Sequence, residues 1–142
     1  SVSIQIANIC SKGEVIAIEK DEEALEIIEK NKSKFNAGNL KVVKGEALAV
    51  EEDICGMFDA IFIGGSGGNI EDIIMRYHLK LKSGCNMVLN FITLDNLYKA
   101  MNTLKDLNYE IECVQVSVNK IKGKSYMMVA NNSIFILTGK KI

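Results

Sequence analysis

Short apolar runs alternate along the chain with longer segments in which apolar residues recur every three or four positions. The short runs are rich in β-branched residues, a pattern typical of strands buried on both faces of a parallel sheet. The longer segments have one apolar side, as expected of helices that cover a sheet. The predicted strands span residues 15–18, 40–43, 59–63 and 87–92, and the predicted helices span 2–9, 21–35, 69–81 and 93–107.

Two of the predicted helices begin after residues that commonly act as N-caps. Asp21 and Thr93 each precede a helical pattern, and their side-chain oxygens suit the unpaired N–H groups of a first turn. Leu79 and Leu94 fall on the apolar stripes, so we expect both to face inward.

The C-terminal part has a different pattern. Residues 110–118 alternate between apolar and polar, and residues 134–138 are apolar. Residues 119–133, which separate them, show no helical pattern, so the two strands should be antiparallel. We expect this connection to be a long irregular loop, a kind of segment that is more often functional than idle.

This order of elements predicts an α/β fold: a parallel sheet with helices on both faces and an antiparallel strand pair at the C-terminus. The 142 residues contain no evident linker, so residues 1–142 are expected to form a single domain.

Composition excludes several classes of protein. The 17 basic and 18 acidic residues give a net charge of −1, so no overall attraction to nucleic acid or to an anionic membrane is expected. No apolar stretch approaches a membrane span and no signal peptide is apparent, which favours the cytoplasm. The four cysteines are far apart and the single histidine, His78, lies on the outer part of a helix. We expect no metal site, buried cysteines and an exposed histidine.

Candidate chemistry lies where the predicted strands end, because ligands of open parallel sheets bind beyond the carboxyl ends of the strands. Glu19 ends the first strand, and a carboxylate there suits the two hydroxyls of a ribose. Gly45, Glu46 and Ala47 follow the second strand and would let a flat ring approach the backbone. Alternatively, Glu19 is a solvated charge near a helix start, and the glycine belongs to an ordinary turn.

The most distinctive motif follows the third strand. The segment 64–68 has four glycines in five residues, which removes side chains where a cofactor and a substrate would meet. Its N–H groups and the start of the next helix could hold negative charge. A merely flexible loop is the alternative, but so many glycines are costly to order unless close approach requires them.

The run Phe62-Ile63-Gly64-Gly65-Ser66-Gly67-Gly68-Asn69 resembles the signature loop of the CbiT-type precorrin carbon-15 methyltransferases (decarboxylating) of cobalamin biosynthesis. The similarity extends over essentially the whole chain. Other matching segments are 1–4, 17–20, 45–47, 88–90, 93–97 and 130–139, although the family commonly has proline where Ser133 stands.

The resemblance implies a Rossmann-like class I S-adenosylmethionine methyltransferase, with a seven-stranded sheet whose last strand is antiparallel. The family's first strand and glycine-rich cofactor loop would precede Ser1, so an N-terminally truncated domain is expected. The implied substrate is a precorrin macrocycle, methylated at carbon 15 and decarboxylated at a ring acetate. The implied partners are further copies of the chain and a methyltransferase for carbon 5.

The resemblance also assigns residues to the two ligands. Glu19 would bind the ribose hydroxyls, Glu46 and Ala47 would border the adenine, and Ser1 would end the methionine-binding loop. The implied cofactor-binding residues are Ser1, Glu19, Lys20, Gly45, Glu46, Ala47, Gly64, Gly65 and Ser66. The implied substrate-binding residues are Gly67, Gly68, Asn90, Thr93, Lys120, Lys122 and Lys124, the lysines as a cationic rim for a polyanion.

No general base can be assigned from the sequence, and an activated methyl donor needs mainly alignment with a nucleophilic carbon. Thr93 is also explained as a helix cap, and the lysines as a solvated loop. Three other functions stay open at this point. They are a class I methyltransferase for a small metabolite or RNA, a nicotinamide-dependent Rossmann oxidoreductase, and a binding module without a cofactor.

Overall fold

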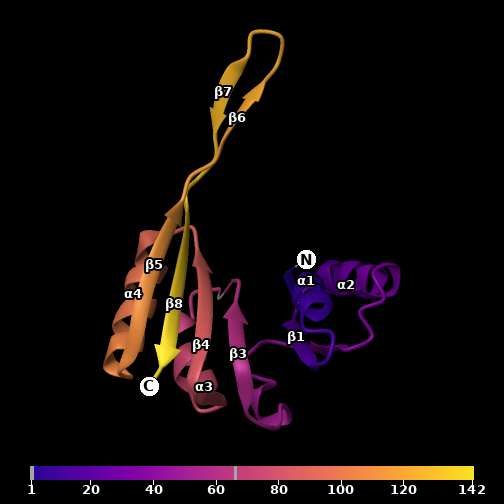
Figure 1. The fold of residues 1–142 in the computed structure, drawn as a ribbon, viewed down its shortest axis with the longest axis vertical. Coiled ribbons are helices and arrows are strands. Elements are labelled where there is room, and N and C mark those ends of the chain that lie inside the picture. Colours follow the sequence, from indigo (N-terminus) through magenta and orange to yellow (C-terminus); the bar gives the residue numbers. More distant parts are fainter. Residues whose placement is uncertain (1, 66) are drawn as a thin grey trace. The chain divides into compact units, whose positions relative to one another are not determined.

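The computed structural model describes residues 2–65 and 67–142. Its elements form two compact units, which divide between Ile54 and Cys55. Figure 1 shows the elements of both units.

The first unit contains a two-stranded parallel sheet and two helices. Strand β1 (Val15–Glu19) pairs with β2 (Leu40–Lys44) in a register that runs from Val15 opposite Leu40 to Glu19 opposite Lys44. Helices α1 (Val2–Ile9) and α2 (Glu22–Lys34) pack on these strands, and a short 3-10 helix (Glu51–Asp53) follows β2. Their shared apolar core comprises Ile4, Ala7, Ile28, Ala37 and Leu40.

Two polar side chains fix the connections of this unit. Asp21 caps α2, because its carboxylate accepts a hydrogen bond of 2.9 Å from the backbone N–H of Ala24, as predicted. The amide Nδ2 of Asn39 lies within 3.0 Å of three carbonyl oxygens at the end of α1 and the start of β1. These contacts tie the entry of β2 to the entry of β1.

The second unit contains a four-stranded sheet in the order β3-β4-β8-β5. Strand β3 (Phe58–Ile63) is parallel to β4 (Leu81–Phe91), and β8 (Ile134–Lys141) lies antiparallel between β4 and β5 (Tyr109–Val116). Helices α3 (Ile70–His78) and α4 (Leu94–Asp106) pack against each other and cover this sheet (Figure 1). The antiparallel C-terminal strand pair is therefore confirmed.

One helix–strand boundary differs from the prediction. Helix α3 ends at His78, whereas the pattern had continued it to residue 81. Leu81 is fully buried but belongs to β4, where it pairs with Phe58. The apolar pattern could not show this change, because the first residue of a buried strand is as apolar as the last residue of a helix. Gly84, with a φ of 77°, lies inside this strand.

The expectation of an irregular loop over residues 119–133 is wrong. The segment forms a hairpin of β6 (Asn119–Lys122) and β7 (Met127–Ala130), with Gly123 and Tyr126 in left-handed conformations at the turn. At its base the hydroxyls of Ser117 and Ser133 lie 2.8 Å apart. We call residues 117–133 the arm, because Figure 1 shows the hairpin projecting beyond the ends of β5 and β8.

Several burial predictions also need correction. Leu79 and Leu94 are 68% and 69% exposed; Leu79 is the C-cap residue of α3 and Leu94 is the first residue of α4. Cys10, Cys55 and Cys113 are exposed rather than buried, and Cys85 is half-buried.

Candidate functional site

The carboxyl ends of β1 and β2 bring together five of the predicted cofactor-binding residues. We call this the first edge; it comprises Glu19, Lys20, Gly45, Glu46 and Ala47. Because Glu19 pairs with Lys44 in a parallel register, the segments that leave both strands start side by side.

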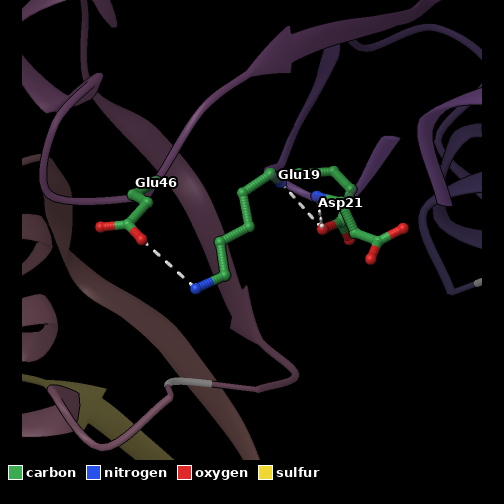
Figure 2. Close-up of polar contacts among 4 residues, drawn as sticks. Glu19, Asp21 and Glu46 are labelled. Carbon is green, nitrogen blue, oxygen red and sulfur yellow. Dashed lines mark hydrogen bonds and ion pairs between the residues drawn. The ribbon is translucent and has the colours of Figure 1, made fainter. Parts of the chain in front are cut away.

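The carboxylate of Glu19 is held in one orientation by the backbone. Its Oε1 accepts hydrogen bonds from the N–H groups of Lys20 (2.8 Å) and Asp21 (2.9 Å), as Figure 2 shows. The described part of the chain places no donor on Oε2. A half-buried, oriented carboxylate with one open oxygen is suited to accept hydrogen bonds from vicinal hydroxyls.

Gly45 is required by space and by backbone conformation. Its φ is 148°, and a Cβ atom placed there would lie 2.4 Å from Cγ1 of Val50. Its N–H donates to the carbonyl of Glu19 (3.0 Å), which joins the exits of β1 and β2. The next turn closes when the N–H groups of Ala49 and Val50 donate to the carbonyl of Glu46.

Charged side chains also cross this edge. Figure 2 shows Glu46 accepting a contact of 3.3 Å from the ammonium of Lys20, although both side chains are about two-thirds exposed. Lys44 pairs with Glu22 beside them, and this hydrogen bond lowers the pKa of the Glu22 carboxyl. Screening by water makes such exposed ion pairs weak, so either side chain can leave its partner and contact a ligand instead.

The carboxyl ends of β3 and β4 form the second edge. Ile63 lies opposite Leu89 in parallel register, so the glycine loop leaves β3 beside the last residues of β4, which ends at Phe91. Gly67 and Gly68 have φ values of 58° and 101°, a conformation that favours glycine. Folding does not require a glycine at position 65, because a Cβ atom placed there would meet nothing within 4 Å.

The start of α3, by contrast, is a poor anion site. Its first turn already carries Glu71 and Asp72, which interact favourably with the positive end of the helix dipole. These carboxylates would repel an anionic ligand. The expectation that this helix start holds negative charge is therefore not supported by the local charges.

The predicted substrate-binding residues do not all lie together. Asn90 and Thr93 lie at the second edge, and Asn90 is on the opposite side of β4 from the buried Leu89 and Phe91. Thr93 is the N-cap residue of α4, but its hydroxyl makes no capping hydrogen bond. The three lysines, Lys120, Lys122 and Lys124, lie exposed on the arm, which carries them beyond the sheet. Ser1 and Ser66 lie outside the described residues.

The second edge also carries exposed apolar side chains that the sequence pattern did not predict. Ile92, Leu94 and Tyr98 are 71%, 69% and 68% exposed, around the junction of β4 and α4. Leu94 and Tyr98 are four residues apart, a spacing that could have revealed a second apolar side of α4 distinct from Leu97 and Leu104.

His78 is half-buried rather than exposed, and it is the last residue of α3. Its Nδ1 is 2.9 Å from the hydroxyl of Tyr109. Burial is the main cause that lowers the pKa of His78, and the positive charge of Lys141 lowers it further. Burial raises the pKa of Tyr109 to about 12. Among residues 2–65 and 67–142, no three His, Cys, Asp or Glu side chains gather as metal ligands. No helix in the same ranges has the length and apolar character to cross a membrane.

Comparisons with known proteins agree with this architecture. A family model for the precorrin methyltransferase domain matches residues 1–140. A probable cobalt-precorrin-6B C(15)-methyltransferase (decarboxylating) from Sulfurisphaera tokodaii is 38% identical over 92% of this chain and 68% of its own length. The cobalt-precorrin-6B C(15)-methyltransferase (decarboxylating) of Salmonella typhimurium is 32% identical over 99% of this chain and 73% of its own.

Solved structures give the same result. Precorrin-6y C5,15-methyltransferase from Geobacter metallireducens superimposes with a TM-score of 0.91 and 39% identity, over 100% of this chain and 74% of that one. A precorrin 8w decarboxylase from Methanobacterium thermoautotrophicum has a TM-score of 0.79 and 26% identity, over 89% and 69%.

The fold is thus the Rossmann-like fold of methyltransferase enzymes, as the sequence motifs predicted. Within that class, the chain belongs to the precorrin methyltransferase domain family.

Proposed function

We propose that the chain transfers a methyl group to carbon 15 of a precorrin or cobalt-precorrin macrocycle and promotes decarboxylation of a ring acetate. S-adenosylmethionine, when bound, supplies a methyl group already activated on a sulfonium. The observation that carries this proposal is the carboxylate of Glu19, which the backbone holds in one orientation. Beside it lies Gly45, where Val50 leaves no room for a side chain.

The residues of the first edge fit a nucleoside. Oε2 of Glu19 accepts hydrogen bonds from the ribose hydroxyls. Glu46 and Ala47 border the adenine next to Gly45, and Lys20 positions Glu46 through their ion pair. Gly64 and Gly65 keep side chains away from the methyl group. Ser1 and Ser66, outside the described residues, complete the proposed cofactor-binding set.

The second edge is proposed to hold the macrocycle. Gly67 and Gly68 allow its close approach, and Asn90 and Thr93 offer polar groups that orient it. The chain need not provide a nucleophile, because a ring carbon attacks the methyl group. The conjugated macrocycle accepts the electron pair left when CO2 departs. Lys120, Lys122 and Lys124 are proposed to attract the peripheral carboxylates of the substrate.

Calorimetric titration with S-adenosylhomocysteine and with NADH tests the cofactor assignment. We expect S-adenosylhomocysteine to bind and NADH not to bind. Glu19→Gln keeps an oxygen for the backbone N–H groups but weakens the ribose site, so affinity should fall by about 1.5–3 kcal/mol. Glu23→Gln, an exposed carboxylate on the next helix, is the matched control and should bind normally. Binding of NADH alone would refute the methyltransferase assignment.

We also propose that copies of the chain associate through the arm. Every residue of β6 and β7 is exposed, including Ile121 and Met128, which are 66% exposed and directly opposite each other. Opposed residues share a face, so this pair lies on the side away from Lys120 and Lys122. A two-stranded hairpin with open edges and an exposed apolar face is only marginally stable alone. Pairing with the arm of a second copy would cover the apolar face and give the open edges hydrogen-bond partners.

Light scattering coupled to size-exclusion chromatography tests this association. Ile121→Lys with Met128→Lys should lower the molar mass to that of one chain, whereas Lys120→Gln on the opposite face should not. An unchanged mass for the double variant would contradict association through the arm. A separate methyltransferase for carbon 5 is a second proposed partner, since the Geobacter neighbour is named for carbons 5 and 15. Co-elution of the two proteins tests it.

A further inference from the structure

The second edge carries an apolar surface that the fold does not use. We call it the entry patch: Ile92, Leu94 and Tyr98, which are 71%, 69% and 68% exposed. Single exposed apolar side chains are ordinary on protein surfaces. Three large ones within seven residues, from the residue after β4 to the second turn of α4, need a physical explanation.

The geometry of α4 shows that the patch is separate from the core. The buried side of this helix is formed by Leu97, Ala100 and Leu104, which are 8%, 0% and 0% exposed. Leu94 and Tyr98 are one turn apart and lie on another side, at the N-terminal end of the helix. They therefore present a second apolar surface where α4 leaves the sheet.

The position of the patch links it to the glycine loop. Strands β3 and β4 are parallel, and Ile63 lies opposite Leu89, so the chain leaves both strands at the same edge (Figure 1). Ile92 follows β4 directly, as Gly64 follows β3. Bare glycine backbone and exposed apolar side chains are thus adjacent features of one sheet edge.

One ion pair lies on the same helix as the patch. Lys99 donates to Asp95 at 2.8 Å, and this hydrogen bond raises the pKa of Lys99. The three side chains of the patch are themselves uncharged, and one of them carries an aromatic ring. Such a surface fits the face of a flat conjugated ring system and offers little to a small polar metabolite.

We infer that Ile92, Leu94 and Tyr98 form the surface against which one face of the macrocycle packs, so that its ring carbon is presented to the glycine loop. This assignment rests on the proposed function and adds residues to it. The patch binds the apolar ring face, whereas the arm lysines act on the carboxylates at the ring periphery. The two contributions differ in their response to salt, because salt screens charges and does not weaken apolar contacts.

Binding of cobyrinic acid, a corrin with free carboxylate side chains, can be followed by its absorption spectrum at low and high sodium chloride. Leu94→Asn and Tyr98→Asn should each raise its dissociation constant about tenfold at both salt concentrations. Tyr98→Phe keeps the ring and should bind within about twofold of the parent. Leu79→Asn is the matched control, because Leu79 is equally exposed at 68% but lies at the C-terminal end of α3.

Each outcome decides the assignment. Loss of corrin affinity in the two asparagine variants, with unchanged affinity for S-adenosylhomocysteine, supports it. Corrin binding as tight as the parent's by the Leu94→Asn, Tyr98→Asn double variant overturns it. A changed molar mass of that variant with unchanged corrin affinity also overturns it, because the patch would then contact a second copy of the chain. A parent that binds S-adenosylhomocysteine but no corrin overturns the proposed substrate as well as the patch.

Discussion

The two sheet edges are built differently, although both lie at the carboxyl ends of parallel strands. At the first edge, backbone N–H groups orient Glu19, and Gly45 packs so tightly against Val50 that no side chain fits. At the second edge, Gly65 has open space around it and Ile92 is largely exposed.

This difference matches two kinds of ligand. A nucleoside has hydroxyls and ring edges in fixed positions, so oriented polar groups can recognise it. A large flat ring is bound mostly through area, so it needs an uncluttered backbone and apolar side chains more than it needs fixed donors. We therefore expect substitutions at the first edge to affect folding and cofactor binding together. Those at the second edge should affect substrate use with little effect on folding.

The largest effect is expected from Gly45→Ala. Both the left-handed φ and the clash with Val50 oppose a side chain there, and together they should cost about 2–5 kcal/mol of folding stability. Thermal unfolding and titration with S-adenosylhomocysteine should decline together. Gly56→Ala separates the two causes, because Gly56 has a φ of 98° with open space around it, and it should cost only the strain. Equal losses in the two variants would show that the contact with Val50 is unimportant.

Gly65→Val should have the opposite profile at the second edge. Nothing lies within 4 Å of a Cβ at this position and its φ is not left-handed, so stability should change by less than about 0.5 kcal/mol. Single-turnover methyl transfer should nevertheless fall about a hundredfold, because misplaced reactants lose much of the benefit of alignment. Gly38→Val, in equally open space at another loop, should be normal in both assays. Activity that falls only in proportion to folded protein would make the loop structural.

The contrast between the edges also explains what the sequence could predict. The cap at Asp21 and the strand end at Glu19 follow from local pattern, because both depend on residues next to each other in the chain. The end of α3 was misplaced because the apolar side chain of Leu81 is buried as part of the sheet and not as part of the helix. The entry patch was not predicted because Leu94 fits the helical stripe, although it is the first residue of the helix and is exposed there.

The arm was unpredictable for a different reason. Its strands are only four residues long, and its apolar residues are buried by nothing within the described chain, so burial could not be inferred from alternation. The three lysines lie together on the arm, and their distance from the glycine loop depends on the hairpin. Their proposed action on the substrate has a direct test.

Replacing Lys120, Lys122 and Lys124 with Gln should raise the dissociation constant of the carboxylate-bearing corrin at low salt. Exposed charge pairs are worth about 0.2–1 kcal/mol each, so the increase should be roughly three- to one-hundred-fold. High salt should erase the difference from the parent, and the affinity for S-adenosylhomocysteine should not change. Equal corrin affinity at low salt would leave the lysines as a solvated face of the arm.

The smallest effect concerns the half-buried His78 and the buried Tyr109 beside it, and it tests whether folding can be perturbed without changing ligand binding. Burial lowers the pKa of His78, so the unfolded chain binds a proton more readily than the folded chain does. Stability should therefore be greatest above the unfolded pKa of about 6.5 and should decline as the pH falls toward the folded pKa. Thermal melts from pH 7.5 to 5.5 should show a steeper decline for the parent than for His78→Gln, which cannot titrate there. Tyr109, whose pKa is raised to about 12, stays protonated throughout, so His78 alone accounts for the difference. S-adenosylhomocysteine affinity at pH 7.5 should be the same in both proteins; a weaker affinity in His78→Gln would show that this cluster is coupled to the ligand edges.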